Sequence, residues 1–96
     1  MSTAFSIVDI RAIAPGIWLV RGRAYEDVAV GNVLFVENPR AAGTREPVRI
    51  SAIVTYGRAL ETLDSGLTGD LTVTAQLGVS LTGADSLSRE ASVRDA

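Results

Sequence analysis

The segment from Leu71 to Thr82 constrains the fold more than any other part of the sequence. Apolar residues occupy every second position, and small or polar residues lie between them. Successive side chains of a β-strand point to opposite faces, so this period of two predicts an antiparallel strand with one buried face. The buried face is predicted to contain Leu71, Val73, Ala75, Leu77, Val79 and Leu81.

Strand-forming sequence recurs along the rest of the chain, and no stretch shows sustained helical spacing. Turn residues separate these runs, most clearly at Ala14-Pro15-Gly16. In one run the even positions from Val48 to Tyr56 are apolar and are predicted to point inward. The further strands are predicted at residues 5–10, 17–25, 33–37, 48–56 and 86–88. Short strands divided by Gly and Asp turns predict an all-β barrel or sandwich.

The chain length predicts one domain. Its 96 residues can bury one hydrophobic core and are too few for two. A hydrophobic fraction of 47% with 21% charged residues is typical of globular proteins. We therefore expect a single domain over residues 1–96, with flexible ends at 1–4 and 89–96.

Three missing residue types limit the chemistry of the chain. There is no Cys and no His, and all nine basic residues are Arg. Disulfides, thiolate nucleophiles, histidine bases and lysine Schiff bases are thereby excluded. Asp64, Asp70 and Asp85 are expected to cap turns, because their spacing matches no calcium loop. We expect a protein that is not an enzyme and that holds no cofactor and no metal.

The N-terminal sequence predicts the compartment. It lacks a basic start followed by a long apolar run, and no apolar stretch approaches the length of a membrane span. We therefore expect a cytoplasmic protein.

Several short motifs between residues 5 and 87 follow one another in a familiar order. They are Val20-Arg21-Gly22-Arg23, the hairpin sequence 27–34, Tyr56-Gly57-Arg58, Gly69-Asp70-Leu71 and the segment 82–87. In this order the chain resembles the β-barrel domain that follows the GTPase domain in translational GTPases such as elongation factors Tu and G. The resemblance implies a small antiparallel Greek-key barrel, here without the phosphate-loop residues of a GTPase. It also implies a surface that contacts RNA, as this barrel does in the translation factors.

The segment Ile17-Trp18-Leu19 departs from the polar sequence that the resembling family has near this point. Ile17 and Leu19 lie on one face of their predicted strand and Trp18 on the other, so the strand is apolar on both sides. Trp18 either closes one end of the barrel or anchors a protein interface. A partner chain is the simplest cover for the second apolar face. Ile17, Trp18 and Leu19 are therefore the candidate protein interface.

Arginines form the second candidate surface. Arg21, Arg23, Arg49 and Arg58 are predicted at outward strand positions, where they would bind phosphate groups of RNA or lie in solvent beside Asp9, Glu26 or Glu37. A net charge of −2 and the absence of Lys disfavour RNA binding. The preferred hypothesis is a stand-alone elongation-factor-like barrel that binds another protein or itself. The alternative is an RNA- or ribosome-associated module, and neither hypothesis involves a nucleotide or a membrane.

Overall fold

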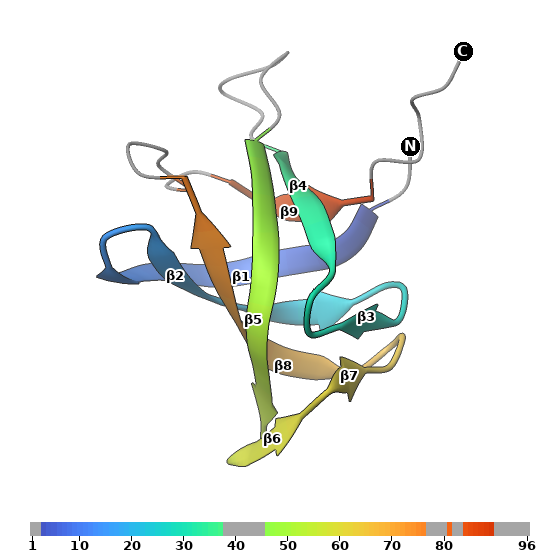
Figure 1. Cartoon of the computed structure of the whole chain (residues 1–96). Coiled ribbons are helices and arrows are strands. Elements are labelled where there is room, and N and C mark those ends of the chain that lie inside the picture. Colours follow the sequence, from blue (N-terminus) through green and yellow to red (C-terminus); the bar gives the residue numbers. More distant parts are fainter. Residues whose placement is uncertain (1–2, 38–45, 77–80, 82–83, 90–96) are drawn as a thin grey trace, which may run out of the picture.

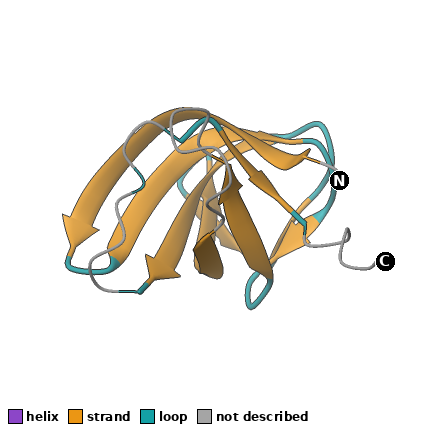
Figure 2. Cartoon of the chain, turned by 90° about the horizontal axis from the view of Figure 1, so that it is seen from above, coloured by secondary structure: helices purple, strands orange, loops and turns teal. Residues whose placement is uncertain are grey.

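The fold is all-β, as the sequence predicts. A computed structural model describes residues 3–37, 46–76, 81 and 84–89. Regular structure in these residues consists of strands alone (Figures 1 and 2). No described residue belongs to a helix that could cross a membrane.

The strands follow the runs of strand-forming sequence. They are β1 (Thr3–Ala14), β2 (Ile17–Ala24), β3 (Val28–Ala29), β4 (Val33–Glu37), β5 (Glu46–Thr55), β6 (Arg58–Leu60), β7 (Thr62–Leu63), β8 (Thr68–Ala75) and β9 (Ser86–Ser88). The predicted turn at Pro15-Gly16 joins β1 to β2, and Gly16 has a φ of 76°, which glycine adopts without strain.

The main sheet closes into a ring. Its strand order is β4-β9-β1-β2-β8-β5-β6, and a further pairing between β4 and β5 joins the two sides (Figures 1 and 2). All pairings are antiparallel, β6 extends the sheet from β5, and β3 and β7 form a separate two-stranded sheet. Some strands that lie side by side in the sheet, such as β2 and β8, are far apart in the sequence. This arrangement distinguishes the ring from an up-and-down barrel and is typical of Greek-key connections.

The core fills the ring with aliphatic side chains and one phenylalanine. The largest fully buried side chains are Phe5, Leu34, Ile50, Ile53, Leu63, Leu71, Leu81 and Leu87, together with four valines. Each such side chain contributes about 1.5–3 kcal/mol to folding when it leaves water. Ile7, Ile10, Trp18 and Leu60 are partly buried and pack against this cluster.

The period-two prediction for residues 71–82 is confirmed over the part that the structure describes. Leu71, Val73 and Ala75 lie buried in β8, and Leu81 is buried as well. Leu77 and Val79 lie outside the described residues. The strand itself begins at Thr68, earlier than the alternation suggests.

The predicted inward face of residues 48–56 is wrong in its second half. A bulge between Ile50 and Ala52 shifts the alternation, so that Ile53 is buried. Tyr56 consequently leaves the core and is 95% exposed in the turn after β5.

The expectation of a flexible end over residues 1–4 is wrong for two of them. Thr3 and Ala4 belong to β1, and Ala4 is fully buried. At the other end, the Arg89 guanidinium donates to Glu26 at 2.6 Å and to the carbonyl of Asp27. Residues 90–96 lie outside the described part of the chain.

Two paired glycines let three strands approach closely. Gly22 of β2 pairs with Gly69 of β8. A Cβ on Gly22 would lie 1.9 Å from the Ser6 carbonyl oxygen and 2.9 Å from the Phe5 ring. The sequence motif around Gly22 therefore reflects a backbone approach that no side chain permits.

Candidate binding surface on strand β2

Strand β2 has apolar residues on both faces at its start. Trp18 and Val20 lie on the face toward the core, since Val20 is fully buried and Trp18 packs against the core cluster. Ile17 and Leu19 lie on the opposite, outer face, and both are half-buried. The structure thus separates the three residues of the candidate interface: two face outward and one faces inward.

Trp18 faces the core of its own chain. Its strand neighbours are Ala12 on β1 and Val73 on β8, and its half-buried side chain packs against the core. An indole in this position contributes apolar contacts within its own chain. The accessible part of the candidate interface is therefore Ile17 and Leu19.

The register places small and polar residues beside the two outward side chains. Leu19 lies opposite Thr72, and Thr72 lies opposite the half-buried Ala52 of β5. We call Ile17, Leu19 and Ala52 the outer strip. Arg11 on β1 faces Leu19 from the other side, so the strip is flanked by a cation.

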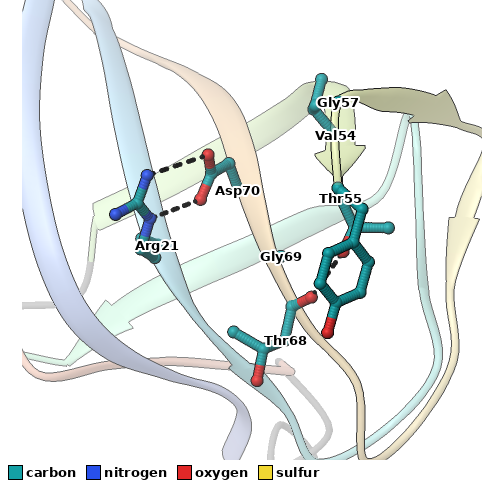
Figure 3. A pocket seen from close by; sticks show the side chains of 8 residues that line it. Arg21, Val54, Thr55, Gly57, Thr68, Gly69 and Asp70 are labelled. Carbon is teal, nitrogen blue, oxygen red and sulfur yellow. Dashed lines mark hydrogen bonds and ion pairs between the residues drawn. The ribbon is translucent and has the colours of Figure 1, made fainter.

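An ion pair lies on the same face, next along β2. The Arg21 Nε donates to Asp70 Oδ1 at 2.9 Å, and the Arg21 Nη2 lies 3.5 Å from Asp70 Oδ2 (Figure 3). The hydrogen bond to Asp70 and its charge raise the pKa of Arg21, and the charge of Asp9 adds to this. Arg21 therefore lies between two carboxylates.

A shallow hollow of about 280 Å³ adjoins this ion pair, between β2, β8 and the turn after β5 (Figure 3). Thr55 donates its hydroxyl proton to the carbonyl of Thr68 at 2.8 Å within this wall. The lining residues are Arg21, Val54, Thr55, Tyr56, Gly57, Thr68, Gly69 and Asp70. The two charged side chains that line the hollow, Arg21 and Asp70, are paired with each other.

The register does not gather the four arginines of the RNA hypothesis. Arg21 and Arg23 lie two residues apart on β2, and Arg49 lies opposite Thr74 on the same outer face. Arg58 lies opposite Thr55, whereas Val54 is the β5 residue that faces Asp70. Because successive strand residues alternate, Arg58 points to the other face of the sheet.

The counter-ion of Arg21 differs from the sequence expectation. Asp9 lies beside Arg21 as expected, but the ion pair is made by Asp70, which was expected in a turn and lies in β8 instead. The two residues are 49 positions apart, and only the pairing of β2 with β8 brings them together. Among the described residues, no group of three acidic side chains lies close enough to hold a metal ion.

Comparisons of the chain with family models, with curated proteins and with solved structures find no match. The resemblance to the translation-factor barrel therefore rests on the sequence motifs alone.

Proposed function

We propose that this protein is a non-enzymatic binding module that contacts another protein through the outer strip of Ile17, Leu19 and Ala52. The observation that carries the proposal is the two-sided apolar character of β2. Its inner face already packs on the core through Trp18 and Val20, yet Ile17 and Leu19 place further aliphatic surface on the outside. Burying such surface against a partner is favourable at about 25 cal/mol per Å².

The residues around the strip define the chemistry of the partner. Arg11 faces Leu19 across the β1–β2 pair, and no ion pair between described residues involves it. Arg21 is occupied by Asp70. A complementary partner therefore presents aliphatic or aromatic side chains next to a carboxylate that binds Arg11.

The alternative, a translation-factor-like contact with RNA, has weaker support. Phosphate binding requires several cations on one surface. Arg23 and Arg49 share the outer face with Arg21, but Arg21 is neutralised by Asp70 and lies beside Asp9, and the register directs Arg58 to the other face of the sheet.

A photo-crosslinking amino acid at position 19 tests the proposal. The matched control carries the same amino acid at Thr62, an exposed position on β7 in the separate small sheet. We expect a discrete adduct at position 19 that is absent at position 62. The crosslinked protein is then purified and must bind the unmodified barrel directly. Equal adducts at both positions, or no direct binding by the purified protein, would contradict the proposal.

A further inference from the structure

Among the residues that the structure describes, the second half of β1 has no strand partner on one side, and we call this side the open edge. Strand β9 pairs with β1 only from Thr3 to Ser6, and the Ile7 N–H extends this contact by one bond to the Asp85 carbonyl at 2.9 Å. The Ala84 N–H donates to the Leu81 carbonyl at 3.0 Å and not to β1. Beyond Ile7, no strand of the described residues pairs with β1 on this side (Figure 1).

The register shows which backbone groups lie along this edge. Ala24 of β2 donates to Leu67 and accepts from Gly66, so it faces β8. Alternation along β2 then directs Arg21 and Leu19 toward β1. Their partners on β1, Asp9 and Arg11, must face β2 in return. The residues between and after them, Ile10 and Ala12, therefore direct their N–H and C=O groups to the open edge.

The side chains along this edge carry opposite charges at alternate positions. Asp9 and Arg11 share the outer face with Arg21 and Leu19, which are their cross-strand partners. Arg21 is already bound by Asp70. Leu19 is uncharged, so it cannot form an ion pair with Arg11. No ion pair between described residues involves Asp9 or Arg11. One negative and one positive group therefore lie on the same face, each available to a new strand.

We propose that β1 pairs with β1 of a second copy of this chain, antiparallel and with the two-fold axis at Ile10. Ile10 then exchanges two backbone hydrogen bonds with Ile10 of the partner subunit. Asp9 lies opposite Arg11 of the partner subunit, and the two-fold repeats this pair. Both pairs occupy positions at which facing side chains come closest, because the adjacent Ile10 residues form the hydrogen-bonded pair.

Charge fixes the register of this pairing. Registers that keep the same face outward differ by two residues. One neighbouring register places Asp9 opposite the partner's Asp9, and the other places Arg11 opposite the partner's Arg11. Like charges directly opposite one another are unfavourable in antiparallel sheets. Only the register centred on Ile10 pairs unlike charges at both positions.

Two bulges limit the pairing to a short segment. The β1–β2 register shifts between Ile7 and Asp9 and again between Ala12 and Ala14. Bulges bend a strand and end its pairing. In the register centred on Ile10, Ala12 would lie opposite the partner's Val8, which is in the first bulge, so the new strand contact is confined to residues 9–11. Val8 and Ile13 flank this segment and are 78% and 52% exposed, and a second copy would cover part of both. An interface this small predicts a dissociation constant of about 10 µM to 1 mM.

The dimer displays two copies of the outer strip on one side. The two-fold axis runs perpendicular to the plane of the sheet that the two β1 strands form. The outer faces of the two copies therefore form one continuous surface. A partner with two binding segments would then bind with increased avidity. The dimer itself does not depend on the proposed partner binding, because it uses the edge of β1 and not the outer strip. The dimer does engage Arg11 with Asp9 of the partner subunit, so a protein partner bound to the dimer contacts the outer strip without a carboxylate on Arg11.

Charge reversal at the two positions tests the register. We expect wild-type protein to show a monomer–dimer equilibrium in sedimentation equilibrium. Asp9→Arg and Arg11→Asp should each weaken it at least about tenfold, because each places like charges opposite one another twice. A one-to-one mixture of the two variants should recover dimers, since both cross-strand pairs are again of opposite charge. Failure of the mixture to recover dimers, or single variants that dimerise like wild type, would overturn the proposal.

Amide hydrogen exchange of the wild-type protein tests the same edge without any variant. The amides of Asp9 and Arg11 face β2 and should exchange slowly at all protein concentrations. The amide of Ile10 should exchange fast in dilute solution and slow down as the protein concentration rises. If the Ile10 amide shows no concentration dependence, the dimer is rejected. If it is protected only by another purified protein, that protein and not a second copy occupies the edge. A Leu19→Gln variant that loses the crosslinked partner but still dimerises separates the two proposals.

Discussion

Arg21 and Asp70 form a two-point ion pair between neighbouring strands, with the Arg21 Nε 2.9 Å from Asp70 Oδ1. The Arg21 side chain remains 57% exposed, so solvent screens the interaction. The pair links the outer faces of β2 and β8, and it engages an arginine that also lies beside Asp9.

The Asp70→Asn variant tests how this ion pair depends on pH. Asp70 raises the pKa of Arg21, so the folded state holds the proton more tightly than the unfolded state. The stabilisation is therefore complete below the ordinary pKa of arginine and is lost only as pH rises through the raised value. We expect Asp70→Asn to lower the free energy of unfolding slightly, by an amount constant from neutral to mildly alkaline pH. Urea denaturation measures this, and added salt should reduce the difference. A difference that changes between neutral and mildly alkaline pH would show that another group is responsible.

Gly22→Ala should destabilise the fold strongly. The new methyl group would lie 1.9 Å from the Ser6 carbonyl oxygen, and only a backbone shift of β1 relieves that overlap. We expect a loss of about 3 kcal/mol, at the upper end of the usual cost of overpacking. Gly57→Ala is the control, because its Cβ meets nothing within 4 Å and its φ of 76° is the only obstacle. Thermal denaturation should give a melting temperature for Gly22→Ala well below that for Gly57→Ala. The reverse order would refute the close approach of β1 and β2.

Tyr56→Asn should stabilise the protein. Tyr56 has a φ of 51° and Gly57 one of 76°, and they form the two-residue turn between the paired residues Thr55 and Arg58. Asn tolerates this left-handed conformation better than Tyr, whose ring is exposed and gains nothing from the core. We expect a gain of about 1 kcal/mol in the free energy of unfolding. A loss of stability on substitution would mean that the exposed ring makes a favourable contact.

RNA binding is expected to be absent even when Arg21 is released from its partner. The Asp70→Asn variant frees the Arg21 guanidinium and removes one negative charge from the outer face. Filter binding with single-stranded and structured RNA at low salt should detect no complex for wild type or for Asp70→Asn. Salt-sensitive binding that strengthens in Asp70→Asn would instead support the arginine surface and the translation-factor alternative.

Local sequence pattern predicted β1, β2, β4, β5, β8 and β9 but not the short strands β3, β6 and β7, and it failed where register decides which face a residue occupies. The alternation from Leu71 identified the buried face of β8. Side chains alternate between the two faces of any β-strand because of its backbone geometry, so this pattern can be read without knowing the strand's neighbours. The prediction for Tyr56 failed because a bulge near Ala52 inserts one residue, and nothing in the sequence marks a bulge.

The candidate surface was predicted only in part for the same reason. The sequence showed that Ile17 and Leu19 share a face, and the structure agrees. It gave no sign that Asp70 would neutralise Arg21, since their contact depends on the pairing of two strands distant in the chain. The open edge of β1 likewise became visible only when β9 proved to end its pairing at Thr3–Ser6.

The most direct test of partner binding by the outer strip is a set of three titrations with the protein captured through position 19. Leu19→Gln removes aliphatic surface from the strip, whereas Thr62→Gln introduces the same side chain at an exposed position of the small sheet. Isothermal titration calorimetry should show a dissociation constant at least about tenfold higher for Leu19→Gln than for wild type, with Thr62→Gln unchanged. Equal affinities for all three proteins would contradict the assignment of the outer strip as the binding surface.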